Sequence, residues 1–311
     1  MAGLFTHFMV CQQAIFDPRL DKKLRQILNA NSDWVYFASA CPDLPYAMFL
    51  GSQNEWADHM HYKSTNGIAI RCREVLRNTW NNPSRLDRIR ASWLFGYISH
   101  LVVDGTIHPV IEQVVGPYSD PKNRENHKYC EKVQDALIFF ECTNGQEINY
   151  AEFSDRFDNC RTSHFFNDLM EFWKQLLIDV YPTINPRPEP KQWFTFFREL
   201  FDSSDNAGGV VAVFRHAGVG KSLVYSTQKE LRRDHRDKCD EYYDNIQLLD
   251  GTRGSFPNIV FKKAVDNLIS RWNDLYATLQ SSDSIATLIP DCDLDTGRKI
   301  NGSNELIYWS A

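Results

Sequence analysis

Three histidines and two carboxylates occur at helical spacing near the middle of the chain. His100, Asp104 and His108 follow one another at four-residue intervals, and His127 and Glu131 are separated by the same interval. Four residues advance an α-helix by about 400°, so the side chains of each set share one face with roughly 40° of drift per step. Neutral imidazole and carboxylate are ligands that zinc takes in proteins. The spacing therefore predicts a metal site, and the alternative is an exposed polar helix face in each case.

Four further residues could add ligands. His7 lies near the chain start, Asp43 lies between two prolines in Cys-Pro-Asp-Leu-Pro, and His59 and His61 lie in Asp-His-Met-His-Tyr. A lone histidine such as His7 is more often structural or solvated than a ligand. Together with the helical stripes, these residues favour a metal cluster over isolated histidines.

Helical periodicity dominates the chain and predicts an all-α fold. The helix that carries His100, Asp104 and His108 is expected over residues 86–108. Pro109 should end this helix, because proline lacks the N–H that continues the hydrogen-bond ladder. The other helices are expected at residues 67–80, 125–140, 165–180, 191–202, 222–246 and 260–281, after an early one that ends near Asn29.

Composition narrows the classes of function. The 311 residues include 34 Lys and Arg against 40 Asp and Glu, a formal charge of −6, which argues against a broad nucleic-acid surface. No apolar run reaches transmembrane length and no secretory signal is evident, so a cytoplasmic location is expected, with non-classical secretion as the alternative. The eight cysteines include no Cys-x-x-Cys, and we expect them to be mostly reduced and structural.

In this order, the early Thr-His, the Pro-Asp loop, the Asp-x-x-His-Tyr motif and the His-x-x-x-Asp-x-x-x-His-Pro helix resemble the zinc-dependent phospholipase C family over about residues 5–140. Its fold is shared with zinc-dependent single-strand nucleases. The resemblance implies a multi-helix metal-site core with a helical C-terminal extension. The composition of the proline-rich stretch Tyr181–Lys191 predicts a stiff connector. This connector would separate a phospholipase C-like catalytic domain at residues 1–181 from a helical extension at residues 191–311, whose role is unknown and which is expected to pack on the catalytic domain.

The resemblance also implies a ligand set for two to three zinc ions. His61 and His100 would bind the first ion with Asp43 beside it, and His59 is the alternative to His61. A second ion would take three ligands, namely His108, His127 and Glu131. Asp104 would bridge the first ion to a third, which His7 would also ligate. Processed family members supply the amine and carbonyl of an N-terminal Trp to that third ion. Met1-Ala-Gly has no Trp, so the His7 side chain or the amine of Ala2 would have to serve.

Such a cluster suits phosphodiester hydrolysis, because two close metal ions can bind the attacking and leaving oxygens and lower the pKa of a bound water. The resemblance implies a phospholipase C acting on phospholipid at a membrane surface. Asp43 would orient or deprotonate the attacking water. A single-strand nuclease and a non-catalytic, metal-stabilised interaction protein are the alternatives.

Residues near the predicted ligands could orient the imidazoles or contact the substrate. Asp58 and Asp135 are candidates to hold the imidazoles in place. Four aromatic residues near the ligands could cradle a headgroup by cation–π contact, with core packing as the commoner role of such side chains. They are Trp34, Tyr46, Trp56 and Tyr62.

Overall fold

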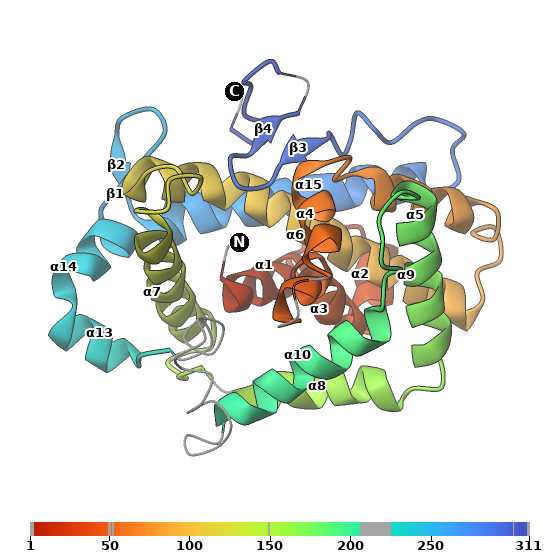
Figure 1. The fold of residues 1–311 in the computed structure, drawn as a ribbon, viewed down its shortest axis with the longest axis horizontal. Coiled ribbons are helices and arrows are strands. Elements are labelled where there is room, and N and C mark those ends of the chain that lie inside the picture. Colours follow the sequence, from red (N-terminus) through yellow and green to blue (C-terminus); the bar gives the residue numbers. More distant parts are fainter. Residues whose placement is uncertain are drawn as a thin grey trace.

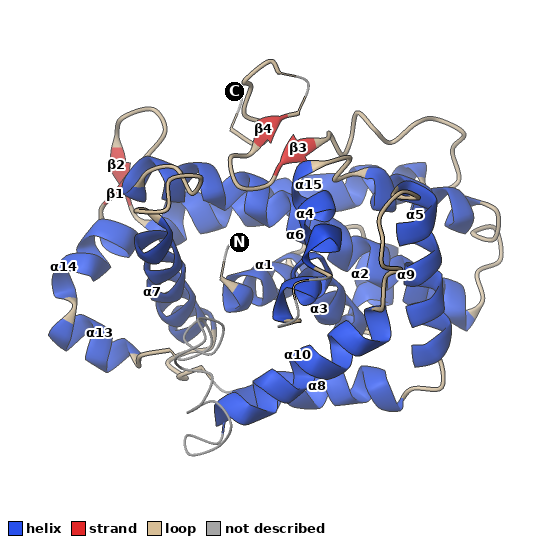
Figure 2. Cartoon of the chain, viewed as in Figure 1, coloured by secondary structure: helices blue, strands red, loops and turns tan. Residues whose placement is uncertain are grey.

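The structure is a computed structural model that describes residues 3–48, 51, 53–148, 150–205, 225–300 and 302–309. Helices make up most of this part of the chain, and its strands form two short antiparallel pairs, β1 with β2 and β3 with β4 (Figure 2). The prediction of an all-α fold is confirmed. Within the described ranges, no helix combines the length and the apolar character needed to cross a membrane.

The elements appear in two runs along the chain (Figure 1). The first run comprises α1 (Leu4–Phe16), α2 (Lys22–Asn29), α3 (Ser32–Ala40), the 3₁₀-helix η1 (Cys41–Ala47), α4 (Asn54–Tyr62), α5 (Gly67–Arg77), α6 (Arg85–Val115), α7 (Arg124–Cys142), α8 (Tyr150–Thr162), α9 (Phe166–Val180) and α10 (Pro190–Asp205). The second comprises α13 (Gln228–Asp234), α14 (Arg236–Cys239), the π-helix η2 (Asp240–Asp244), β1 (Ile246–Gln247), β2 (Arg253–Gly254), the π-helix η3 (Phe256–Phe261), α15 (Lys262–Thr278), β3 (Cys292–Asp293) and β4 (Arg298–Lys299).

Helix α6 is a central helix on which several others pack. It starts with a capping box, in which the side chains of Ser84 and Asp87 each accept a hydrogen bond from the other residue's backbone N–H. Every residue from Ala91 to Ile111 is buried. A helix buried on all sides belongs in the centre of a domain, and α1, α3, α5, α7 and α15 all contact α6. His100, Asp104 and His108, which lie within this stretch, are therefore held away from solvent.

Helix α3 approaches α6 very closely at a glycine. A Cβ atom on Gly96 would lie 2.3 Å from the carbonyl oxygen of Val35, so a larger residue would push the two helices apart. Because α3 runs directly into η1, this close contact also sets the position of Ser39 and Asp43 relative to α6.

The prediction that Pro109 ends this helix is wrong, since α6 continues to Val115. An interior proline removes one backbone hydrogen bond, but Val110 and Ile111 beyond it are buried and hold the last turns in place. In addition, Trp309 Nε1 donates a 2.7 Å hydrogen bond to the carbonyl of Thr106, in the turn that precedes the proline.

The single helix predicted at 222–246 is also wrong over the residues the structure describes, which begin at 225. The chain breaks at His235, whose backbone is not helical (φ −132°, ψ 39°), and forms α13, α14 and η2 instead. The break lets the chain turn so that α13, α14 and η2 all pack on α7. Gln134 Nε2 on α7 donates to the Tyr242 carbonyl at 3.1 Å. Tertiary packing thus overrides local helix propensity here.

Buried side chains from before and after the proline-rich stretch belong to one core. Trp272 on α15, for example, packs on Phe95 and donates its indole N–H to the Phe95 carbonyl at 2.9 Å. Within the stretch, the Pro186 carbonyl accepts a hydrogen bond from Trp56 Nε1 at 3.0 Å. The division into domains at residues 181 and 191 stays a prediction. All eight cysteines are free thiols, and seven of them are buried.

Candidate metal centre

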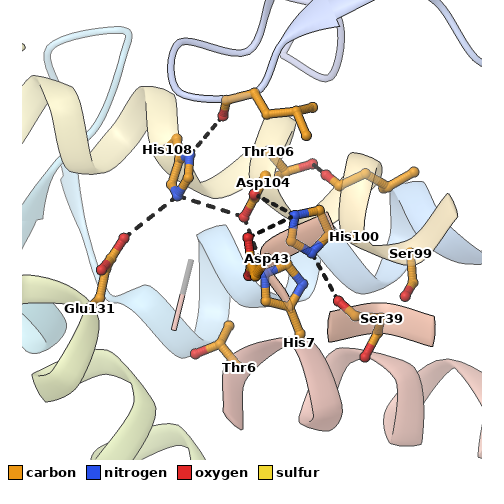
Figure 3. A network of polar contacts seen from close by, with 12 residues as sticks. Thr6, His7, Ser39, Asp43, Ser99, His100, Asp104, Thr106, His108 and Glu131 are labelled. Atoms are coloured by element: carbon orange, nitrogen blue, oxygen red, sulfur yellow. Dashed lines mark hydrogen bonds and ion pairs between the residues drawn. The ribbon is translucent and has the colours of Figure 1, made fainter. Parts of the chain in front are cut away.

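The structure brings all eight predicted ligand residues into one cluster at the centre of the helices. Figure 3 shows part of this cluster, namely His7, Asp43, His100, Asp104, His108 and Glu131. They come from five elements that are far apart in the sequence. The set is His7 on α1, Asp43 on η1, His61 on α4, His100, Asp104 and His108 on α6, and His127 and Glu131 on α7. The helical spacing thus does place each predicted stripe on one face of its helix.

Three donors form a first group beside η1. His61 Nε2 lies 3.0 Å from Asp43 Oδ1 and 3.3 Å from His100 Nε2, and His100 Nε2 lies 3.7 Å from the same Asp43 oxygen. Ligands placed tetrahedrally at zinc–nitrogen and zinc–oxygen bond lengths are about 3.3 Å apart. The three donor atoms therefore stand at spacings that suit one zinc ion.

A second group lies where α6 faces α7. Glu131 Oε1 lies 3.1 Å from His127 Nε2 and 3.6 Å from His108 Nε2. His127 and Glu131 are neighbours on one helix, whereas His108 comes from the other, so this group ties the two helices together. Its spacings suit a zinc ion as well as those of the first group do.

Asp104 lies between these groups and a third position marked by His7. Its Oδ2 is 3.1 Å from His100 Nε2, and its Oδ1 is 3.2 Å from His7 Nε2 and 3.6 Å from His108 Nε2. The imidazole rings of His7 and His100 stack with centroids 4.5 Å apart. A carboxylate with an oxygen on each side can bridge metal ions, which an imidazole cannot do through one nitrogen. Asp104 thus connects all three positions.

Backbone carbonyls fix the tautomers of three histidines. The Nδ1 atoms of His61, His100 and His108 lie 2.8, 2.8 and 2.6 Å from the carbonyl oxygens of residues 57, 39 and 294. A carbonyl oxygen only accepts, so each Nδ1 carries the proton and donates. In the neutral ring each Nε2 then presents a lone pair to the cluster. Lone pairs and carboxylates that converge in this way need a cation between them, so the donor set fits zinc.

The pKa values of the buried groups agree with a cation bound between these side chains. Burial lowers the pKa of His100, but the nearby carboxylates of Asp104 and Asp43 outweigh it and raise that pKa to about 9. Burial alone would raise the pKa of Asp104, yet the surrounding imidazoles hold it well below its usual range. The carboxylates therefore remain charged and draw positive charge into the cluster.

A family model described as zinc dependent phospholipase C matches residues 6–184, more than half of the chain. The chain belongs to the zinc-dependent phospholipase C family. No curated protein and no solved structure matches it. Membership in this family makes the protein a zinc-dependent hydrolase. Seven of the eight clustered residues lie between Asp43 and Glu131, and the eighth, His7, falls at the start of the matched range.

The metal centre reaches solvent at two of its three carboxylates. The side chains of Asp43 and Glu131 are 14% and 13% exposed, whereas the five clustered histidines are at most 1% exposed. The centre therefore meets solvent at the side chains of Asp43 and Glu131. Tyr46 and Tyr62 flank His61, with ring centroids 5.5 and 6.0 Å from its ring.

The remaining sequence candidates lie outside the cluster. Trp34 and Trp56 are part of the buried core. His59 packs its ring on Tyr181 and belongs to none of the ligand groups found among the described residues. Asp58 accepts a hydrogen bond from the Tyr46 hydroxyl at 2.8 Å and contacts no imidazole among the described residues. The N-terminal amine considered for the third ion lies outside the described residues.

Asp135 acts on the centre indirectly, through the start of α1. Its carboxylate accepts hydrogen bonds from the backbone N–H groups of Phe5 and Thr6 at 3.1 and 2.7 Å, and from the hydroxyls of Thr6 and Tyr225 at 2.6 Å each. A negative charge is favourable at a helix N-terminus. Asp135 therefore fastens the helix that carries His7 to α7.

Sequence reasoning missed one contributor, the turn after β3. The carbonyl that holds His108 belongs to Leu294, and Asp295 Oδ2 accepts a 2.7 Å hydrogen bond from the Tyr62 hydroxyl. A backbone carbonyl is present at every residue, so no residue type marks this contact in the sequence.

Proposed function

We propose that the protein is a phospholipase C that hydrolyses the phosphodiester of membrane phospholipids and releases diacylglycerol and a phosphorylated headgroup. The observation that carries the proposal is the convergence of five imidazoles and three carboxylates in one buried cluster that meets solvent at Asp43 and Glu131. Buried charges of one sign are unfavourable unless they are paired or bind metal. Family membership makes zinc the natural partner.

We assign the donors to the ions from the distances between them. His61, His100 and Asp43 would hold one zinc ion, and His108, His127 and Glu131 a second. Asp104 would join these groups and, with His7, would serve a third ion. Zinc bound here would supply Lewis acidity, which offsets the negative charge that develops on the phosphoryl oxygens during hydrolysis.

Residues of the chain itself position the attacking water, the metal-binding imidazoles and the substrate. Asp43 is the first-group residue whose side chain reaches solvent, so it orients the attacking water and takes its proton. The carbonyls behind His61, His100 and His108 fix the rings so that the Nε2 atoms keep their direction during turnover. Tyr46 and Tyr62 flank His61 and would contact the headgroup of the substrate.

The test combines a zinc count with a substrate panel. Purified protein should contain at least two zinc ions per chain and should release phosphorylated headgroup from phosphatidylcholine or another phospholipid. A chelator should abolish the release, and added zinc should restore it. Protein with one zinc ion or none would refute the cluster. Cleavage of single-stranded DNA or RNA in place of lipid would identify a nuclease, and zinc-loaded protein without any hydrolysis would identify a non-catalytic member of the family.

A further inference from the structure

The C-terminal segment touches the metal centre although it lies beyond the part of the chain that the family model matches. Leu294 makes two contacts there. Its carbonyl accepts a hydrogen bond from His108 Nδ1 at 2.6 Å, and its N–H donates to the backbone carbonyl of His61 at 3.0 Å. Leu294 is thus hydrogen-bonded to His108 on α6 and to His61 on α4, which are proposed ligands of two different zinc ions.

We propose that the turn of residues 293–297, here named the C-terminal turn, is a positioning element of the metal centre that secures the zinc ion of the His108 group. This inference rests on the proposed function, since it assigns a role around the same ions. The turn contributes no metal ligand of its own. It acts through His108, whose tautomer and ring orientation it fixes.

The comparison among the three carbonyl-bonded histidines shows why this turn matters. His61 takes its carbonyl from Ala57, four residues earlier on the same helix, and His100 takes its carbonyl from Ser39 on α3. Both partners lie within residues 6–184. His108 alone among the three depends on a carbonyl from beyond that range. Without it, water would face Nδ1, and the ring would be free to turn or to change tautomer.

Specific contacts hold the C-terminal turn in place. Asp295 Oδ2 accepts from the Tyr62 hydroxyl at 2.7 Å, which ties the turn to α4. The Gly297 N–H donates to the Asp293 carbonyl at 2.8 Å and closes the turn itself. These bonds secure the position of the Leu294 carbonyl independently of any metal.

Gly297 sets the distance between the C-terminal turn and α6. Its φ of +65° lies in the left-handed region. A Cβ atom at this position would lie 2.5 Å from the Gly105 carbonyl oxygen and 2.5 Å from Pro109 Cγ, two atoms of α6 on either side of His108 in sequence. Any side chain at residue 297 must therefore lift the turn from α6 and draw the Leu294 carbonyl away from His108.

A second glycine provides a matched control. Gly302 also has a positive φ, +79°, but a Cβ atom there would meet nothing within 4 Å. Gly297→Ala and Gly302→Ala therefore introduce similar backbone strain, and they differ in whether the new methyl group collides with α6. The comparison separates displacement of the turn from strain in the segment.

The experiment measures how fast zinc leaves the protein in excess chelator. In Gly297→Ala, one zinc ion should dissociate about 10- to 100-fold faster than in wild type, the range typical for loss of a contact behind a metal-bound histidine. Gly302→Ala should release zinc at the wild-type rate. Urea unfolding of the zinc-free proteins serves as a second readout, because a turn that only stabilises the fold would lower the midpoint without selective zinc loss.

Tyr62→Phe tests the same idea without a change of backbone or charge. It removes the hydroxyl that anchors Asp295, and it should also accelerate the loss of one zinc ion, by a smaller factor than Gly297→Ala. Equal zinc release from wild type, Gly297→Ala and Tyr62→Phe would overturn the inference while leaving the proposed function intact. Wild-type protein that binds no zinc would instead refute the proposed function, and the inference with it.

Discussion

Replacing Asp43 by Asn should separate catalysis from zinc binding. Asp43 Oδ1 is 3.0 Å from His61 Nε2 and 3.7 Å from His100 Nε2, so an amide oxygen of the same size can still face the first zinc ion. Asparagine, however, cannot accept a proton at neutral pH. The variant should therefore keep its metal and lose the group that takes the proton of the attacking water.

The expected loss follows from the place of this carboxylate. Its side chain is 14% exposed, whereas the side chains of His61 and His100 are at most 1% exposed, so Asp43 is the first-group residue that incoming water meets. A positioned general base contributes about 10²- to 10⁴-fold to a rate, equivalent to about 3–5 kcal/mol of transition-state stabilisation. We expect kcat to fall by about that factor. The rate measured at saturating lipid should show the loss in full.

The assay is headgroup release from mixed micelles, with zinc measured on the same samples. Asp58→Asn is the matched control, because it removes the same charge near the centre from a residue whose carboxylate bonds the Tyr46 hydroxyl. That variant should retain most of the wild-type kcat. An Asp43→Asn protein with wild-type kcat would refute the base assignment. If it lost zinc together with activity, Asp43 would be a ligand whose removal dismantles the site, and catalysis and zinc binding would not be separable at this residue.

Two other substitutions test the bridging role of Asp104 and the hydrogen bonds of Asp135 to the start of α1. Asp104→Asn should lower the zinc retained after dialysis by at least one ion per chain, since Asp104 lies between all three positions; unchanged zinc content would contradict a bridging role. Burial raises the pKa of Asp135 to about 6 from 3.8, so the stability that this group contributes is complete below about pH 4 and is lost as the pH rises through 6. We would measure the unfolding free energies of zinc-free wild type and zinc-free Asp135→Asn as a function of pH. The wild-type value minus the variant value should fall by up to ~3 kcal/mol between pH 4 and pH 7. A difference that stays constant with pH would show that Asp135 does not titrate in this range.

The sequence predicted the part of the centre that depends on local geometry. His100, Asp104 and His108 share a face of α6 because four-residue spacing fixes their direction wherever a helix forms. The same holds for His127 and Glu131 on α7. Motif order then indicated which isolated residues, such as Asp43, would join them. These inferences need no knowledge of how the helices pack.

The remaining features of the fold and of the metal centre depend on tertiary packing, which leaves no pattern in the local sequence. Helix α1 carries His7 but was not predicted, because it is buried nearly all round from Phe5 to Cys11 and so lacks an amphipathic period. The Leu294 carbonyl lies 186 residues from His108, and any residue type could supply it. The length of α6 beyond Pro109 likewise depends on neighbours that bury its last turns.

Charge and donor count together bear on how many zinc ions the centre holds. The cluster contains three carboxylates, Asp43, Asp104 and Glu131, and its histidines are neutral when they bind metal. Two zinc ions would leave one net positive charge, which the single negative charge of a phosphodiester would neutralise. A third ion would raise the net charge to three inside a buried site, which is costly unless further anions bind. Among the described residues of the cluster, His7 is the one donor that remains once the two groups and the bridging Asp104 are assigned. We therefore expect two ions to bind tightly and a third to bind more weakly, so a zinc titration should show two classes of site.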